Sequence, residues 1–445
     1  MYVNVKEFIE QNEILKVREF LIKQEAVDVA YVIENLDKEY QAIVFRILPK
    51  NLAAETFAYL DSDVQKSLIL QFSDSELKEM LNKLFVDDAV DIIEEMPSNI
   101  VKRLLNNASA QKREEINELL KYPKNSAGSI MTTEYISLKR DMSVNDAIER
   151  IRNKGTNSET IYTCYVTDKD RVLTGIVSVK DLLLAAQNTL VGDIMESNFK
   201  YVTTTVDRET TAQLISKYGL LAIPVVDFEG RLVGIVTVDD AMEVLNDEVT
   251  EDIEAMAAIL PSDKPYISTS VISLWLKRVP WLLILMISAT FTGAIIRNYE
   301  NAMQNGYIIL TSFIPMLMDT GGNCGSQASV SVIRSISLNE IKLKDIFKVA
   351  WKEIRVAFLC GVTLSIANFI KLTLVDRVEL PVAGIVCLTL IITVFIAKLV
   401  GCILPILAKS IRLDPAVMAS PFITTIVDAL SLLIYFNIAT NLLKI

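Results

Sequence analysis

The sequence contains no histidine at all. This absence excludes histidine-based acid–base catalysis, histidine zinc ligands and histidine pH switches. Cysteine is also sparse: none of the five forms a C-x-x-C pair and four lie in the apolar half, so we interpret them as buried small hydrophobic residues and expect neither disulfides nor a zinc site. The chain also lacks a nucleotide-cleaving P-loop and any nucleophile–base pair, so an enzyme is not expected.

Basic residues are too few in the first part of the chain to bind nucleic acid. Residues 1–275 hold 29 Lys+Arg against 46 Asp+Glu, a net charge of −17, whereas residues 276–445 hold 15 against 9, a net of +6. No basic footprint for nucleic acid is present, and the acidic surplus favours divalent cations as partners. The charged N-terminus lacks the apolar core of a signal peptide, so we expect the acidic half to remain in the cytoplasm.

Residues 1–125 show apolar side chains at helical spacing throughout, with a repeat of 24 residues. Pro49, Ser73 and Pro97 recur at this period, each after an apolar residue. Repeated helical units predict a superhelical all-α domain. Acidic residues at the corners between helices are interpreted either as N-caps or as cation ligands.

Residues 126–249 contain short β-rich runs and an internal repeat. The sequence G-S-I-M at 128–131 corresponds to G-D-I-M at 192–195, and G-I-V-S-V-K-D at 175–181 corresponds to G-I-V-T-V-D-D at 234–240. This pattern resembles a tandem pair of CBS domains, which we place at 126–187 and 188–249. The resemblance implies that Asp181 and Asp240 are candidates for binding a nucleotide ribose, with ATP as a regulatory ligand, and a helix N-terminus can receive a phosphate. The alternative is that the motif only caps helices.

An acidic connector precedes the apolar half, and we expect a connecting helix over 250–275. No lysine or arginine occurs from residue 232 to residue 263. Like charges spaced four residues apart on one helical face repel, so either divalent cations or solvation must relieve them. The candidate cation-sensing residues here are Asp239, Glu243, Asp247, Glu248, Glu251, Asp252 and Glu254.

Long apolar stretches within residues 276–445 predict a transmembrane domain, with five helices in the lipid bilayer of the cell membrane. The expected spans are 279–297, 306–333, 350–375, 381–408 and 416–443. Lysine and arginine concentrate before the first span, between the second and third, and between the fourth and fifth. These three sites fall on one side, so we expect cytoplasmic N-terminal domains and an external C-terminus.

Asp428 is the lone acidic residue within the last apolar stretch. A charge at that depth costs at least about 2.5 kcal/mol, which indicates a functional site. It shares a helical stripe with Pro421, Thr424 and Thr425, where we expect the proline to weaken the helix and free backbone carbonyls. Such hard oxygen ligands suit Mg²⁺ or Ca²⁺. The alternative is a carboxylate buried against a basic partner such as Lys398.

The second span contains P-M-L-M-D-T-G-G-N-C-G-S-Q-A-S at 315–329. Its glycines and proline predict an irregular backbone, which is tolerated at membrane depth where it lines a water-filled cavity. Its polar residues fit a pore lining. The alternative is close packing of helices through small residues.

This run, the run D-P-A-V-M-A-S-P-F-I-T-T-I-V-D at 414–428 and the order of the domains resemble the MgtE family of magnesium channels or transporters. The resemblance implies a homodimer with a Mg²⁺ pore on its two-fold axis, lined by Asp428, Thr424 and Asn323. It also implies that cytosolic Mg²⁺ bridges Asp87 and Asp91 of the helical domain to the CBS pair and the connecting plug helix, closing the pore by negative feedback.

An alternative function remains open at this point. The chain could carry other divalent cations, such as Co²⁺, Mn²⁺ or Ca²⁺, under control of nucleotide binding to the CBS pair. An all-oxygen pore lining does not discriminate among these ions.

Overall fold

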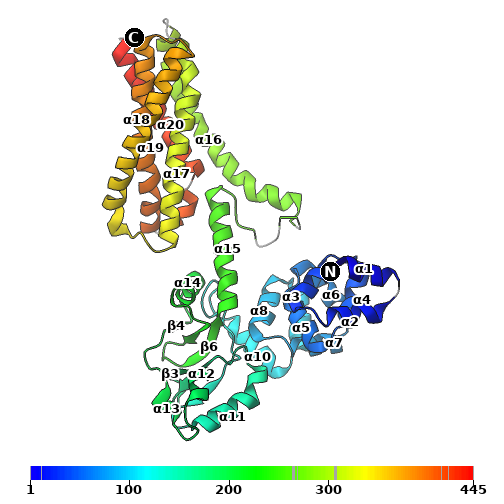
Figure 1. Cartoon of the computed structure of the whole chain (residues 1–445). Helices are drawn as coiled ribbons and strands as arrows, with labels where there is room; N and C mark the ends of the chain where they lie inside the picture. Colours follow the sequence, from blue (N-terminus) through cyan, green and yellow to red (C-terminus); the bar gives the residue numbers. More distant parts are fainter. Residues whose placement is uncertain are drawn as a thin grey trace. The chain divides into compact units, whose positions relative to one another are not determined.

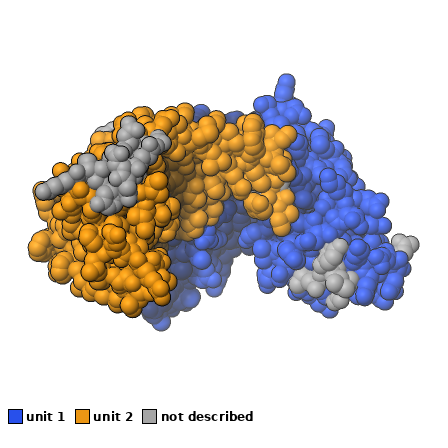
Figure 2. Space-filling model, turned by 90° about the horizontal axis from the view of Figure 1, so that it is seen from above, with its two compact units in different colours: residues 1–246 blue, residues 247–445 orange. Residues whose placement is uncertain are grey.

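The computed structural model describes residues 2–11, 13–262, 266–267, 269–304, 308–411, 413–418 and 420–443. The chain divides into two compact units, residues 1–246 and residues 247–445, which are coloured separately in Figure 2. Unit 1 contains the helical domain and the CBS pair, and unit 2 contains the apolar helices (Figure 1).

The helical domain confirms the prediction from periodicity. Alternate helices stack on one another, α3 on α5, α5 on α7 and α7 on α9, which produces a superhelix. Pro49, Ser73 and Pro97 are the N-cap residues of α5, α7 and α9, so the 24-residue repeat corresponds to one helix pair. The helices are α1 (Tyr2–Glu10), α2 (Ile14–Leu21), α3 (Ala26–Glu34), α4 (Lys38–Arg46), α5 (Lys50–Ala58), α6 (Ser62–Gln71), α7 (Asp74–Leu81), α8 (Val86–Glu95), α9 (Ser98–Asn107) and α10 (Ala110–Leu119).

Each CBS copy forms a three-stranded sheet with helices. The strand orders are β1-β2-β3 and β4-β5-β6, with the first pair in each sheet parallel and the second antiparallel. The elements of the first copy are β1 (Ser137–Lys139), α11 (Val144–Lys154), η1 (Gly155–Asn157), β2 (Thr163–Thr167), β3 (Leu173–Ser178) and α12 (Val179–Leu184). Those of the second are α13 (Val191–Ile194), β4 (Val202–Thr203), α14 (Arg208–Tyr218), β5 (Ala222–Val226) and β6 (Leu232–Thr237), followed by α15 (Val238–Met256).

The repeated sequence motifs are explained by contacts that cross between the copies. The segment before β1 pairs with β6 of the second copy, and the segment before β4 pairs with β3 of the first. A Cβ on Gly234 would lie 2.6 Å from the Sδ of Met131, so the glycine makes room for this methionine. A Cβ on Gly175 would likewise lie 2.7 Å from the Sδ of Met195. The two copies therefore fold as one interlocked pair.

The connector differs from the expectation of a helix over 250–275. Helix α15 continues the last helix of the second CBS domain without a break and ends at Met256. No helix is present between Met256 and Val271 among the described residues, and Pro261, which lacks an amide donor, lies in this interval. Positions 263–265 and 268 of the predicted connector lie outside the described residues.

Unit 2 is a helical bundle whose long helices are α16 to α20 (Figure 1). Four helical segments are long and apolar enough to cross a membrane: 271–299, 343–374, 380–410 and 421–443. Helix α17 falls outside this group because of its polar residues and glycines, but it packs tightly against α19 and α20. The elements are α16 (Val271–Gln304), η2 (Ile308–Phe313), α17 (Ile314–Ser337), η3 (Leu343–Asp345), α18 (Ile346–Leu374), α19 (Leu380–Ser410), η4 (Pro415–Met418) and α20 (Ser420–Leu443).

Two expectations about backbone irregularity are wrong. The glycine-rich run at 315–329 is continuous α-helix, because close contacts with neighbouring helices compensate for the weak helix propensity of glycine. Pro421 lies in the first turn of α20, where a proline is tolerated without weakening the helix. The irregular turns precede the helices, as η2 and η4. The predicted start of the second span, at 306, lies outside the described residues.

Candidate functional site

One face of α17 carries polar side chains that no part of the described chain covers. Asp319, Asn323 and Gln327 are exposed and recur every four residues, so they form one stripe along the helix. The opposite side of the helix is buried in the bundle. A polar stripe of this kind is costly in contact with lipid, and polar groups at membrane depth face a water-filled cavity or another helix.

Glycines bring α17 against α20 at this stripe. A Cβ on Gly322 would lie 2.9 Å from the Cγ2 of Thr424, and one on Gly325 would lie 2.7 Å from the Cγ2 of Ile423. Only glycine permits this approach. The alternative reading of the glycine run, close helix packing, is therefore supported, and this packing places Thr424 beside the helix that carries Asn323.

Asp428 is half-buried on α20, and the charge that acts on it is Asp319 of α17. The alternative of a buried pair with Lys398 is wrong, because the Nζ of Lys398 lies 3.8 Å from the Oε2 of Glu353 on α18. The pairing of Asp319 with Asp428 was not predicted. The sequence does show Asp319 within the polar run of the second span. It does not reveal that Asp319 lies near α20.

The threonines of α20 that precede Asp428 already use their hydroxyl protons. Both Thr424 Oγ1 and Thr425 Oγ1 donate to the carbonyl oxygen of Pro421, each at 2.9 Å. Their hydroxyl oxygens retain lone pairs and can still accept hydrogen bonds from the waters of a hydrated ion.

A second group of acidic residues lies in unit 1, where the helical domain meets the CBS pair. The first turn of α8 brings Asp87 and Asp88 here, and Asp91 follows one turn later. The facing carboxylates come from the CBS pair: Glu134, Glu159, Asp239, Asp240 and Glu243. The structure therefore brings together the predicted residues Asp87, Asp91, Asp239 and Glu243.

The carboxyl groups of this interface hold their protons more tightly than usual. Desolvation and then the charges of Asp240 and Glu243 raise the pKa of Asp91 to about 8, although Asp91 keeps an exposed edge. Burial followed by Asp240 raises the pKa of Glu159 to about 8, and burial raises those of Asp88 and Asp240 to about 6. Burial and Asp240 raise the pKa of Asp87 well above its ordinary value. The interface thus holds more negative charge than its positive charge offsets.

Lys112 supplies the one ammonium group that lowers a pKa in this cluster among the described residues. Its Nζ donates to Glu134 Oε1 at 3.0 Å and to the carbonyl oxygen of Leu84 at 2.5 Å. Glu134 Oε2 in turn accepts from the backbone N–H of Val86, at the start of α8. Sequence reasoning did not select Asp88, although it follows Asp87 in the chain. It also missed Glu134 and Glu159, because only the folded interface brings these two residues beside the predicted ones.

The end of α15, in unit 2, contacts the helices of the bundle. Asp252 accepts a hydrogen bond from Ser337 Oγ, at the end of α17, at 2.9 Å. Burial raises the pKa of Asp252, and Asp414 adds to the rise. Ala255 and Met256 pack against Ile333 and Ala416. Of the predicted acidic residues of the connector, Asp247, Glu248 and Glu251 also lie on α15 within unit 2, and Glu254 Oε2 accepts from the Ser262 N–H.

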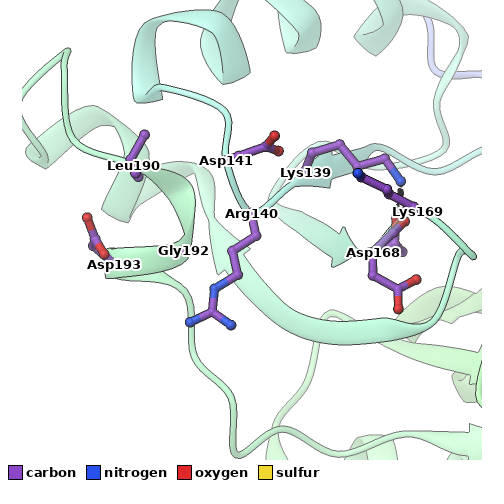
Figure 3. Close-up of a pocket in the computed structure, with 9 residues that line it drawn as sticks. Lys139, Arg140, Asp141, Asp168, Lys169, Leu190, Gly192 and Asp193 are labelled. Carbon is purple, nitrogen blue, oxygen red and sulfur yellow. Dashed lines mark hydrogen bonds between the residues drawn. The ribbon is translucent and has the colours of Figure 1, made fainter.

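The two candidate nucleotide residues lie in different surroundings. Asp181 is exposed and accepts from Ser178 Oγ at 2.5 Å, whereas Asp240 accepts from Thr237 Oγ1 at 2.6 Å amid the acidic cluster. Carboxylates around Asp240 favour a cation over a phosphate. Neither residue lines the 380 Å³ cavity beside the ends of β1 and β2 (Figure 3). Lys139, Lys169 and Asp168 lie at one end of this cavity and Leu190 and Asp193 at the other.

Within the described residues, no three or more carboxylate or thiol groups are placed to hold a metal ion together. The polar stripe of α17 and the neighbouring α20 offer one carboxylate each, Asp319 and Asp428, and the interface in unit 1 offers several that interact electrostatically. Each arrangement therefore suits a cation that keeps its waters. A cation held directly would need further ligands from a second copy of the chain.

Comparison with known proteins identifies the family. The chain is 34% identical over 452 residues to "Magnesium transporter MgtE" of Thermus thermophilus, an alignment that covers 99% of this chain and 98% of that protein. The chain belongs to the MgtE family. A relative of the same name from Bacillus subtilis is 30% identical and covers 96% of this chain and 94% of its own.

Matches to family models confirm the order of domains. The MgtE intracellular N domain matches 24–125, CBS domains match 127–188 and 191–247, and the divalent cation transporter domain matches 314–438. This chain is thus a multi-pass membrane protein with an intracellular N domain, and its family is one of transporters, not enzymes.

Solved structures agree with the fold of the cytosolic half. The cytosolic domain of the Mg²⁺ channel MgtE in complex with ATP is 33% identical, covers 55% of this chain and all of that one, and has a TM-score of 0.52. The soluble part of a magnesium transporter is 30% identical, covers 56% of this chain and 97% of that one, and has a TM-score of 0.53.

Proposed function

We propose that this chain is a Mg²⁺ channel or transporter for magnesium uptake. The observation that carries the proposal is the uncovered polar stripe of α17. Its Asp319 acts electrostatically on Asp428 of α20. In a membrane, this stripe requires water or a second helix bundle. A homodimer supplies both when the stripes of two copies face each other across a wet pore on the two-fold axis.

Hydration explains the preference for Mg²⁺. Mg²⁺ loses its waters reluctantly and requires octahedral geometry. Paired Asp428 carboxylates from two subunits, with the side chain of Asn323 and the backbone near Thr424, bind the hydrated ion through its waters. Selectivity then follows from the size of the hydrated complex. The relatives named as magnesium transporters support this assignment.

Cytosolic Mg²⁺ closes the pore by negative feedback in this proposal. Bound cations neutralise the carboxylates between α8 and the CBS pair and along α15, so the helical domain docks and the connector blocks the pore. At low Mg²⁺ the same carboxylates repel, and the pore opens. The raised pKa values of Asp91 and Glu159 support the proposal, because they show how strongly this interface disfavours unneutralised charge. The positively charged loops support an external C-terminus.

Uptake assays test the ion and the feedback separately. Mg²⁺ influx into proteoliposomes containing the full chain is measured with Co²⁺, Mn²⁺ or Ca²⁺ as competitors, and Mg²⁺ should be preferred. Equal transport of all four ions would support the alternative of a general divalent carrier. Neutralising Glu243, Asp247 and Glu251 together should weaken inhibition by internal Mg²⁺, and unaltered inhibition would show that these residues are only solvated.

Regulation by ATP rests on a different observation, the relative whose cytosolic domain was solved with ATP. Asp181 and Asp240 are the candidate ribose ligands. Calorimetry on the purified chain, with ATP at several Mg²⁺ concentrations, tests this function. No heat of binding at any Mg²⁺ concentration would remove nucleotide from the proposal.

A further inference from the structure

Lys398 is a buried charge inside the membrane bundle. It lies on α19 and is 4% exposed. Lysines in membrane helices usually extend along the helix to reach water. Lys398 lies roughly 18 Å along α19 from Ser410, at about 1.5 Å per residue, which is further than a lysine side chain extends. Because the side chain of Lys398 is buried, its charge requires a partner inside the protein.

Glu353 on α18 provides that compensation. Its Oε2 lies 3.8 Å from the Nζ of Lys398, and the side chains are 15% and 6% exposed. The same Oε2 is buried and accepts no hydrogen bond from the described residues. Lys398 is its only ion-pair partner within the described part of the chain. Each charge of the pair thus depends on the other.

The pair continues an interface that runs along two antiparallel helices. Ser365 Oγ donates to the carbonyl oxygen of Cys387 at 3.3 Å, and Gly361 would place a Cβ 3.5 Å from the Cα of Ile391. The three contacts pair residues 365, 361 and 353 of α18 with residues 387, 391 and 398 of α19, in the order expected of antiparallel helices. The ion pair is therefore the charged end of a regular helix contact and sets the same register.

The pair also lies beside the crossing of α19 and α17. A Cβ on Gly401 would be 2.2 Å from the carbonyl oxygen of Gly325, so the two backbones touch there. Lys398 precedes Gly401 by one helical turn and acts electrostatically on Cys324, next to Gly325. Asn323 is exposed and points away from this buried crossing. Lys398 thus acts on the buried side of α17, whereas the polar stripe lies on its exposed side.

We propose that Glu353 and Lys398 are positioning residues for transport: their buried charge pair locks α18 to α19 behind α17 and so fixes the stripe that carries Asp319 and Asn323. The pair does not touch the transported ion. This inference rests on the proposed function, because it assigns a role to the stripe in the pore.

Charge-paired variants of the full chain test the inference in proteoliposomes, with Mg²⁺ influx divided by the amount of reconstituted protein. The variants are Lys398→Met, Glu353→Gln, the double variant K398M/E353Q and the swap K398E/E353K. Removal of one charge should lower the influx per molecule by at least about tenfold and shift the Mg²⁺ concentration at half-maximal influx, because misplaced binding groups lose transport steeply. The double variant should return to within about threefold of the native influx, because it leaves no unpaired charge buried between the helices.

The matched control is the exposed pair Lys371–Asp376, whose atoms lie 3.0 Å apart at the other end of α18. K371M/D376N should transport normally. If the double variant is no better than the single ones, or if Glu353→Gln fails while Lys398→Met transports normally, then Glu353 acts on the ion itself and the inference is overturned. If single variants lower only the amount of folded protein and leave half-maximal influx unchanged, the role is purely structural and the inference also fails.

Asp428→Asn is measured in the same series. Normal influx in this variant would contradict the proposed pore itself. Asp428→Asn could lose influx while the double variant K398M/E353Q loses as much as the two single variants combined. That result would contradict only the role of the charge pair.

Discussion

The Nζ of Lys112, in the helical domain, lies 3.0 Å from Oε1 of Glu134 at the start of the CBS pair. This ion pair crosses the interface where the carboxylates of α8 meet those of the CBS domains. Lys112 is 8% exposed and also donates to the carbonyl oxygen of Leu84. A lysine therefore already occupies part of the interface that we assign to cytosolic Mg²⁺.

Replacing Lys112 with Met should make the transporter less sensitive to internal Mg²⁺. Loss of a hydrogen-bonded buried charge costs about 1.5–3 kcal/mol, and the remaining carboxylates repel more strongly, so docking of the helical domain requires more Mg²⁺. Influx measured against internal Mg²⁺ should show a higher half-inhibitory concentration. Lys124→Met is the control, because Lys124 is 78% exposed in its 3.7 Å pair with Glu94. An unchanged or lower half-inhibitory concentration in Lys112→Met would contradict this role.

The variant D87N/D91N should dock without Mg²⁺ more readily than the native chain, yet lose Mg²⁺-dependent inhibition. Neutral side chains remove both the repulsion and the ligands, so the docking equilibrium no longer responds to the ion. The measurement is the ratio of influx at low and at high internal Mg²⁺, which should approach one. Asp28→Asn, on the exposed first turn of α3, is the control. A native ratio in D87N/D91N would exclude these residues from sensing.

Docking of the helical domain in Mg²⁺-free buffer should depend on pH. The pKa values of Asp91 and Glu159 are raised to about 8 and those of Asp88 and Asp240 to about 6. The docked state therefore binds more protons than the undocked state, so docking is favoured at low pH and weakens as pH rises from about 4, the ordinary carboxyl range, to about 8. Amide hydrogen exchange of α8 should slow on acidification after correction for the intrinsic rate. Saturating Mg²⁺ should remove most of this dependence. Protection that rises with pH would contradict the sign.

Gly401→Ala should destabilise the membrane bundle. The new methyl group would lie 2.2 Å from the carbonyl oxygen of Gly325, and overpacking of this kind costs typically about 1–3 kcal/mol. The midpoint of thermal unfolding in detergent should fall. Gly384→Ala on the same helix is the control: nothing lies within 4 Å of its Cβ position, and alanine is the better helix former. Equal midpoints for the two variants would contradict the close crossing of α17 and α19.

Sequence reasoning succeeded where a pattern has one structural reading. Helical periodicity predicted the N-terminal domain, and the internal repeat predicted the CBS pair. The isolated carboxylate in an apolar run pointed to Asp428, whose role in a pore stays a prediction. The residues missed at the cytosolic interface, such as Glu134 and Glu159, have no local signature, because their neighbours are set by how α8 docks on the CBS pair.

Packing decided the points that the sequence left open or predicted wrongly. Glycine-rich α17 is regular helix because α20 and α19 press against its glycines, a contact that helix propensity does not describe. The partner of Lys398 is Glu353 because of the register of α18 against α19. Predicting that pair needs the helix interface, not the spacing along one helix.

Growth rescue of a magnesium-uptake-deficient bacterium tests whether Asp428 lines a Mg²⁺ pore. The native chain, Asp428→Asn and Asp428→Ala are compared at equal amounts of protein in the membrane. We predict rescue by the native chain and little or none by either variant, because neither retains the carboxylate that faces the hydrated ion. Equal rescue by all three would contradict the account.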